Sequence, residues 1–276
     1  MPYPRAHWYV LVVIAVIVAG FWPSYFGAWN EAPWQFHAHG IAAGLWVVTV
    51  FAQSWTAHHR QLPLHRAIGK VSLFLFPFLT GGLAAIIDVT GKGYVAGDGI
   101  ARQMFGGSFL IGMAVAMAAY VTVYYRAMKY RRKAWTHAGY MLTTPLILFE
   151  SPFSRLLIMF VPMFAIAGLA DLGHIMSSII WSMALELVII AFVWWKYREK
   201  ATPFLVAGGF IVVQMITMGL MGDLPVLKSV LTTVGHMPSL AVWGTGFAIG
   251  ALTSWAGWKA GKPAARVPLD EAPQPA

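Results

Sequence analysis

The chain has 276 residues, of which 59% are hydrophobic and only 11% are charged, and its net charge is +9. About a quarter of the residues in an ordinary soluble domain are charged, so this composition excludes one. The chain contains no cysteine, which excludes disulfides, thiolate metal sites and cysteine nucleophiles and leaves nine histidines as the most adaptable ligands. A mean hydropathy of +0.66 predicts that lipid or other apolar helices surround most of the chain.

Eight apolar runs are long enough to cross a bilayer, which takes about 20 residues per helix. Because no linker divides the chain, we expect an all-α, polytopic membrane helix bundle that forms one transmembrane domain over residues 1–261. The proline-rich stretch 262–276 is expected to be a disordered cytoplasmic tail. The eight runs lie at about residues 8–27, 34–56, 67–89, 104–125, 138–160, 175–195, 203–222 and 237–258.

The placement of lysine and arginine predicts the orientation of the bundle. If the runs alternate in direction, fifteen of the nineteen Lys and Arg residues lie on one side, three lie on the other, and Arg155 lies within a run. Positively charged short loops face the cytoplasm, so both termini are predicted to be cytoplasmic. The net positive charge therefore predicts topology in a lipid bilayer and not a nucleic-acid-binding surface.

Three histidines at the predicted outer ends of the second, sixth and eighth runs each precede a tryptophan by seven residues. Seven residues make nearly two helical turns, so each indole is expected about 10 Å deeper on nearly the same face. One interpretation is an aromatic belt at the membrane interface. The other is a common site in which the three histidines bind a metal ion. The pairs are His39 with Trp46, His174 with Trp181, and His236 with Trp243.

Four charged residues in or near the membrane are candidate catalytic groups. Glu150 and Arg155 lie on the long fifth run, which contains prolines and is expected to kink near Pro152 or to fold back at the outer face. The two side chains are interpreted either as an ion pair that braces the kink or as partners of the outer histidines. Asp171 precedes one of those histidines by one helical step. Glu186, near the middle of the sixth run, is either a proton-relay carboxyl or a satisfied interhelical group.

A second group of histidines is predicted at the cytoplasmic face. His65 begins the third run and His137 begins the fifth, and both runs rise from the same side, so the two rings could face each other. His7, His58 and His59 lie near arginines and are typical of a face that meets anionic lipid headgroups. For His65 and His137, a headgroup contact and a cofactor site are both open.

Three short motifs that contain histidine follow one another along the chain. They are His39-Gly40, Leu64-His65-Arg66-x-x-Gly69 and His137-x-x-Tyr140-Met141, and they are accompanied by Trp46, Gln53 and Arg155. In these motifs, over residues 34–160, the chain resembles a family of uncharacterised bacterial multi-spanning membrane proteins with an HR-x-x-G loop and a downstream His-x-x-x-Met helix start. It also resembles, more weakly, b-type haem membrane proteins. Some related groups have been linked to haem or to oxidase assembly, so the resemblance implies haem chemistry and a bacterial cytoplasmic (inner) membrane. His174 and His236 are additions to that pattern.

The first hypothesis for the function is a b-type haem protein for transmembrane electron transfer, in which imidazoles from facing helices bind the iron. His65 and His137 form one pair of ligands, two of the three outer histidines form another, and a quinone or other redox partner is expected. The flat pocket in this hypothesis is lined by Trp46, Trp181 and Trp243, with Gly106 and Gly107 allowing close approach.

Two further hypotheses come from other classes. One is a Zn- or Fe-dependent membrane hydrolase or oxidase with a site formed by His39, His174 and His236 and completed by Asp171 or Glu150. This site resembles those of ceramidase-like and adiponectin-receptor-like hydrolases only in the types of residue that would bind the metal ion. The other is a transporter or assembly subunit without a cofactor, in which the intramembrane acids mark a proton or substrate path. All three hypotheses are open at this point.

Overall fold

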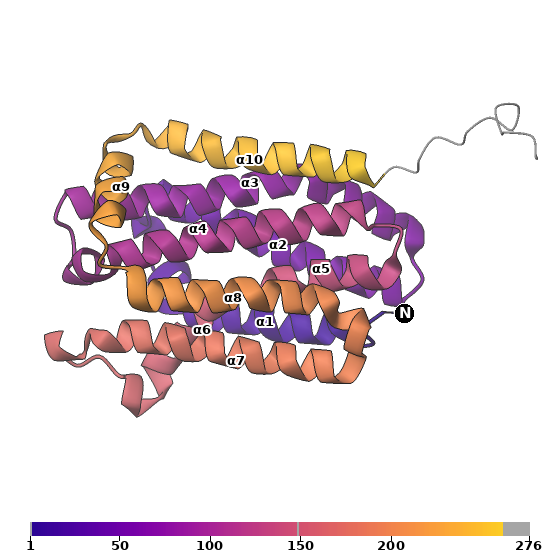
Figure 1. Ribbon diagram of the computed structural model, residues 1–276, viewed down its shortest axis with the longest axis horizontal. Coiled ribbons are helices and arrows are strands. Elements are labelled where there is room, and N and C mark those ends of the chain that lie inside the picture. Colours follow the sequence, from indigo (N-terminus) through magenta and orange to yellow (C-terminus); the bar gives the residue numbers. More distant parts are fainter. Residues whose placement is uncertain (1, 148, 262–276) are drawn as a thin grey trace, which may run out of the picture.

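The computed structural model describes residues 2–147 and 149–261, which form a bundle of helices with no strand, so the predicted all-α class is confirmed (Figure 1). The predicted tail at 262–276 lies outside the described residues. The first helices are α1 (Ala6–Phe21), α2 (Trp34–His58), α3 (Leu62–Val95), α4 (Ile100–Lys129) and α5 (Ala134–Ile147). They are followed by α6 (Glu150–Phe160), α7 (Gly173–Tyr197), α8 (Thr202–Met221), α9 (Pro225–His236) and α10 (Ser239–Ala260). Short π or 3-10 turns are η1 (Trp22–Phe26), η2 (Trp29–Glu31), η3 (Pro162–Phe164), η4 (Leu169–Asp171) and η5 (Arg198–Ala201).

Most of the long helices run along the long axis of the molecule, and α9 crosses one end between α8 and α10 (Figure 1). Helix α3 packs mainly against α2 and α10, while α4 packs against α8, α5 and α10. Each of the eight apolar runs lies mainly in these helices, although 8–27 continues from α1 into η1, 237–258 begins before α10, and 138–160 is divided between α5 and α6. Helix α9 was not predicted, because its twelve residues carry a lysine and several hydroxyl side chains.

Five segments of the described chain are long and apolar enough to cross a membrane: Ala6–Phe26, Trp34–His58, Leu62–Val95, Ile100–Lys129 and Leu169–Met221. The last segment contains two helices, α7 and α8, which pack against each other around the turn η5. Large apolar side chains also point outward from the bundle, as Phe74 (75% exposed) and Leu220 (82% exposed) show. Such a surface is compatible with a membrane protein. The count of eight spans and the side on which the termini lie stay predictions.

The core between α2, α3 and α4 is aromatic. Trp46, Phe76 and Tyr124 are fully buried, and the rings of Phe76 and Tyr124 stack with centroids 4.0 Å apart. The indole Nε1 of Trp46 donates a hydrogen bond to Thr144 Oγ1 on α5 at 2.9 Å. This contact ties α5 to the core and satisfies the polar atom of the buried indole.

The backbone breaks at two places that bear on the predicted site. Helix α5 ends at Ile147 and α6 begins at Glu150, so Pro152 lies in the first turn of a new helix, where its missing N–H costs nothing. Helix α9 ends at His236, and Met237 is extended (ψ 150°) before Pro238, as expected for a residue that precedes proline. His236 and Trp243 are therefore on two different helices, and the prediction that they share one helical face was wrong.

Candidate functional site

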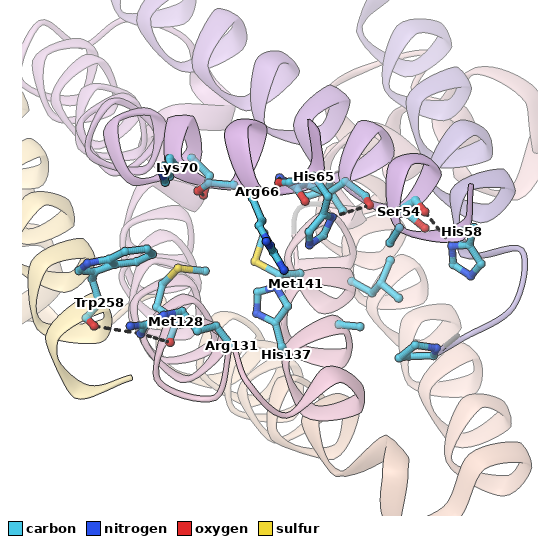
Figure 2. Close-up of a pocket in the computed structure, with 18 residues that line it drawn as sticks. Ser54, His58, His65, Arg66, Lys70, Met128, Arg131, His137, Met141 and Trp258 are labelled. Atoms are coloured by element: carbon cyan, nitrogen blue, oxygen red, sulfur yellow. Dashed lines mark hydrogen bonds between the residues drawn. The ribbon is translucent and has the colours of Figure 1, made fainter. Parts of the chain in front are cut away.

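A cavity of about 420 Å³ lies at the end of the bundle that carries the N-terminus, and it brings His65 and His137 together (Figure 2). We call it the histidine cavity. His65 comes from the first turn of α3 and His137 from the first turn of α5. Figure 2 shows both imidazoles turned toward the same space, with Arg66 between them in this view.

Both rings are held in the same way. The Nδ1 atom of His65 lies 3.1 Å from the backbone oxygen of Gln53, and that of His137 lies 2.9 Å from the backbone oxygen of Ala127. A carbonyl oxygen only accepts, so Nδ1 is the protonated donor in each ring and Nε2 carries the lone pair of the neutral imidazole. This arrangement is the one that fixes the tautomer of a metal-binding histidine. Each histidine is therefore oriented for Nε2 to act as a ligand or hydrogen-bond acceptor.

The HR-x-x-G motif supports this geometry through Gln53. The Gln53 side chain donates from Nε2 to the backbone oxygen of His65 at 2.9 Å, so the two residues hold each other from both sides. A Cβ on Gly69 would lie 3.2 Å from Gln53 Nε2, so a glycine leaves room for this side chain. The motif thus has a local structural role in placing the ring of His65.

The remaining lining of the histidine cavity combines thioethers and cations. Met141, one turn after His137 on α5, and Met128 at the end of α4 line the cavity. Arg66 and Lys70 line it from α3, and Arg131 donates from Nη1 to the backbone oxygens of Met128 (3.0 Å) and Trp258 (2.9 Å). A ligand in this cavity would meet apolar walls, soft sulfur atoms and a positively charged edge.

His58 also lines the histidine cavity, although the sequence placed it among residues that meet lipid headgroups. Its Nδ1 donates to Ser54 O at 2.7 Å, and its Nε2 is buried without a partner. The signal that sequence reasoning missed is the position of His58 on the last turn of α2, a few residues before the first turn of α3, which carries His65.

A second cavity, of about 760 Å³, is lined by residues of α1, α2, α3, α4, α6 and α8. We call it the Glu150 cavity. Three of the predicted candidates line it: His39, Glu150 and Arg155. His39 Nδ1 and Glu150 Oε2 are buried without a hydrogen-bond partner. The position of His39 depends on a close approach of α2 to α3, because a Cβ on Gly82 would lie 2.8 Å from His39 Cα.

Glu150 is the centre of a buried polar group. Glu186 on α7 is only 1% exposed, and its Oε1 has no hydrogen-bond partner. Gln214 on α8 is also buried and lines the same cavity as Glu150. Arg155, on the same helix as Glu150, donates from Nη1 to Ser151 O at 2.7 Å and to Ser151 Oγ at 3.1 Å. The sequence therefore identified three members of this group, and Gln214 is the one it missed.

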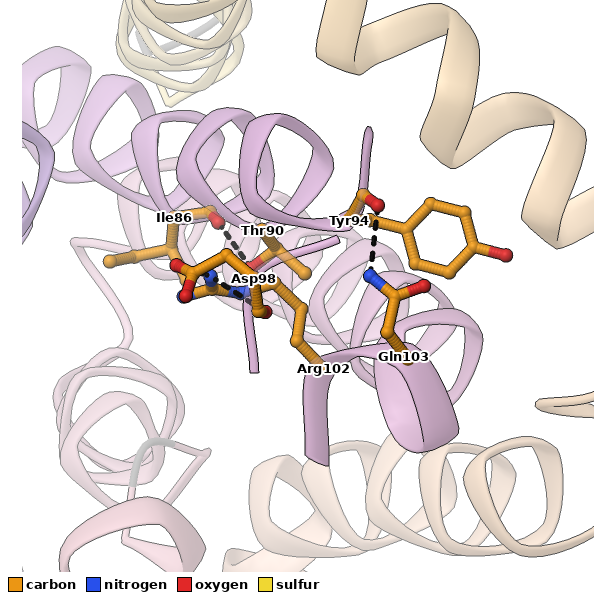
Figure 3. A network of polar contacts seen from close by, with 6 residues as sticks. All are labelled: Ile86, Thr90, Tyr94, Asp98, Arg102 and Gln103. Carbon is orange, nitrogen blue, oxygen red and sulfur yellow. Dashed lines mark hydrogen bonds and ion pairs between the residues drawn. The ribbon is translucent and has the colours of Figure 1, made fainter. Parts of the chain in front are cut away.

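The α3–α4 turn, whose polar contacts Figure 3 shows, contributes residues to the lining of the Glu150 cavity. Arg102 Nη1 donates to Asp98 Oδ2 at 2.6 Å, and Gln103 Nε2 donates to Tyr94 O at 2.9 Å. Gly97 and Gly99 have φ angles of +72° and +75°, which favour glycine. The turn thereby places a charged pair, Asp98 and Arg102, at the edge of an otherwise largely apolar cavity.

The other predicted metal ligands lie apart from this group. His174 Nδ1 donates to Ala165 O at 2.7 Å, and Asp171 Oδ2 accepts from the backbone N–H groups of Ala167 and Gly168. His236 ends α9. Among residues 2–147 and 149–261, no three His, Asp or Glu side chains are placed to hold one metal ion. The site of His39, His174 and His236 stays a prediction that this structure does not assemble.

The three predicted pocket tryptophans have different environments. Trp46 is fully buried in the core, Trp181 is 58% exposed, and Trp243 stacks on Phe247 with centroids 5.1 Å apart. None of the three lines either cavity. The predicted glycines of α4 serve another purpose: Gly106 faces Leu231 of α9, and Gly107 contacts the backbone of Gly222 after α8.

Sequence reasoning also passed over Asp88, which is fully buried on α3. Its Oδ2 accepts from Gln35 Nε2 at 3.0 Å, and its Oδ1 lies 3.1 Å from Lys92 Nζ. Lys92 donates in turn to Met237 O at 2.8 Å, between α9 and α10. This network joins α2, α3 and the α9–α10 junction. The sequence indicated it only by the presence of an acidic residue inside an apolar run.

In comparisons with protein-family models, curated proteins and solved structures, none matched the chain.

Proposed function

We propose that this protein is an integral membrane protein that binds b-type haem in the histidine cavity and transfers electrons within the bilayer. The observation that carries the proposal is the paired geometry of His65 and His137. They line one cavity from two helices, and a backbone carbonyl holds each Nδ1 so that Nε2 has the free lone pair. Two neutral imidazoles are a common axial ligand pair for haem iron.

The rest of the cavity fits the chemistry of haem. Its size of about 420 Å³ lies within the usual range of cofactor pockets, about 300–1,000 Å³. Arg66, Lys70 and Arg131 supply cations for the two propionate groups. Met141 follows His137 by one turn, and a thioether there would raise the reduction potential if it replaced an imidazole. Bound haem would supply one-electron chemistry, and the chain would supply the ligands, the apolar surroundings and the charge at the edge.

We further propose eight spanning helices with both termini in the cytoplasm of a bacterial cell, in its inner membrane. Two helices share the segment Leu169–Met221, α10 is 22 residues long, and α5 with α6 covers the remaining apolar run. Arg66, Lys70 and Arg131 lie at the same end of the bundle as the N-terminus, as cytoplasmic loops require. In this orientation the histidine cavity lies near the cytoplasmic face.

The test is an absorption spectrum with metal analysis of protein purified in mild detergent without chelator. We expect a Soret band that sharpens on reduction. His65→Ala and His137→Ala should remove the same spectral component, because both rings hold the same iron. His59→Ala is the matched control, since His59 is exposed and lies outside the cavity lining.

Three outcomes would contradict the proposal. A colourless protein with stoichiometric zinc would favour the membrane hydrolase instead. A protein without haem and without metal would favour a transporter or assembly subunit. Haem that persists unchanged in both histidine variants would place the cofactor elsewhere in the bundle.

A further inference from the structure

The Glu150 cavity is separated from the histidine cavity by the aromatic core. Val47 on α2 lines the Glu150 cavity, and Val50, one turn later on the same helix, lines the histidine cavity. On α4, Ala116 lines the Glu150 cavity and Met128 lines the histidine cavity. The fully buried Tyr120 and Tyr124 lie between these two residues in the sequence. A ligand in the Glu150 cavity would therefore lie close to the haem proposed for the histidine cavity without sharing its site.

The polar atoms of the Glu150 cavity indicate what kind of ligand it fits. His39 Nδ1 and Glu150 Oε2 both lack a partner, although burial without a hydrogen bond is unfavourable for either atom. A purely apolar chain would leave both atoms unsatisfied. A ligand that satisfies these atoms would carry a group that exchanges hydrogen bonds with an imidazole nitrogen or a carboxyl oxygen.

The charges of the cavity favour a neutral head group. The lining contains two acidic side chains, Asp98 and Glu150, and two basic ones, Arg102 and Arg155, and Arg102 forms an ion pair with Asp98 at the edge. This lining therefore has no excess of positive charge for an anionic head group, whereas the histidine cavity has three cations at its edge. The other walls come from aliphatic and aromatic side chains, among them Ile17, Phe36 and Met113. These walls suit a long apolar tail.

We propose that the Glu150 cavity binds the head group of an isoprenoid quinone or quinol, with His39 and Glu150 hydrogen-bonded to its ring oxygens. His39 Nδ1 donates to a quinone carbonyl in one tautomer and accepts from a quinol hydroxyl in the other. A carboxyl oxygen has the same dual capacity, depending on its proton. Both redox forms of the ring are thereby accommodated. The choice of a quinone among neutral, oxygen-bearing lipids rests on the proposed haem function.

Gly44 offers a direct way to block the cavity. It lies on α2 in the cavity lining, and a Cβ at this position would meet no atom within 4 Å. Gly44→Phe should therefore project a ring into open space without a collision at Cβ. Glu150→Gln is the conservative polar variant. Thr217→Ala is the matched control, because Thr217 is on α8 outside the lining and hydrogen-bonds only within its helix.

The experiment uses the full chain in phosphatidylcholine nanodiscs, a photoreactive azidoquinone as probe and decylubiquinone as competitor. We expect saturable labelling of peptides from α2, α6 or α8 that decylubiquinone suppresses. Gly44→Phe should weaken competition by decylubiquinone about tenfold or more, and Glu150→Gln should weaken it less, whereas Thr217→Ala should not change it. A melting temperature within the range of wild type will show that each variant is folded.

The haem spectrum is recorded on the same samples, so the two proposals fail separately. Non-saturable labelling, labelling confined to lipid-facing residues, or unchanged competition in Gly44→Phe would overturn the quinone site even if the haem spectrum is intact. Saturable labelling that Gly44→Phe abolishes would support the quinone site even in protein that lacks haem. In that case the proposed function would fail and the binding site would stand.

Discussion

Asp88→Asn should destabilise the bundle, because Asp88 is the buried centre of a network that joins three parts of the chain. The side chain is 0% exposed, it accepts a hydrogen bond from Gln35, and it forms an ion pair with Lys92. Lys92 also donates to Met237 O at the α9–α10 junction. Asparagine keeps the size of the side chain and an oxygen for Gln35, so the substitution removes mainly the charge.

The expected loss follows from the burial of the two partners. Removal of one member of a fully buried ion pair costs about 3–5 kcal/mol, whereas an exposed pair contributes about 0–1 kcal/mol. Asp88 is fully buried, but the Lys92 side chain is 36% exposed and can partly turn to solvent. We therefore expect the free energy of unfolding to fall by about 2 kcal/mol.

The assay is reversible unfolding in mixed detergent micelles with increasing SDS, for wild type, Asp88→Asn, Lys92→Met and the double variant. If the two charges stabilise each other, the double variant should lose about 1–2 kcal/mol less than the sum of the two single losses. Asp223→Asn is the control, because its pair with Lys228 is exposed and should matter little. A loss below about 0.5 kcal/mol for Asp88→Asn would refute the reasoning, since it would show that this network does not hold the bundle together.

Two further substitutions test the core and the N-terminal contact. Trp46→Phe should cost about 1–2 kcal/mol in the same assay, because it removes the bond to Thr144 and leaves a small void, whereas the exposed Trp181 should tolerate the same change; equal effects would contradict the assigned burial. Tyr3→Phe should cost about 1 kcal/mol near neutral pH, because the Tyr3 hydroxyl donates to Lys200 O. Burial and the neighbouring Tyr197 raise the pKa of Tyr3, so its contribution is complete below the ordinary pKa of about 10 and is lost as pH rises above it. The difference between wild type and Tyr3→Phe should therefore shrink in unfolding measurements above pH 10, and a constant difference would show that the hydroxyl is not the cause.

The sequence located the helices more accurately than it located the site. Each apolar run lies mainly in helices, because a long apolar segment away from water must satisfy its backbone hydrogen bonds internally. The pattern Gly-His-x-x-Ser-x-x-x-Trp occurs twice in the sequence and contains two of the His–Trp pairs, but it was less informative. Its copy beginning at Gly173 is continuous within α7, whereas the copy beginning at Gly235 is divided by an extended residue before Pro238. Identical spacing therefore gave two different local structures, because one proline changed the backbone.

Composition and the lengths of the apolar runs determined the all-α class and indicated a chain compatible with a membrane, since both depend on summed hydropathy and on helical length. The positions of His65 and His137 in the sequence predicted that both lie near helix starts on the same side of the bundle. Only the tertiary structure decided which groups meet across helices. It placed His65 and His137 in one cavity, placed His39 and Glu150 in the lining of another, and did not bring His39, His174 and His236 together in one group of possible metal ligands. The reason is that helix rotation and the close packing at glycines such as Gly82 depend on partner helices that lie far away in the sequence.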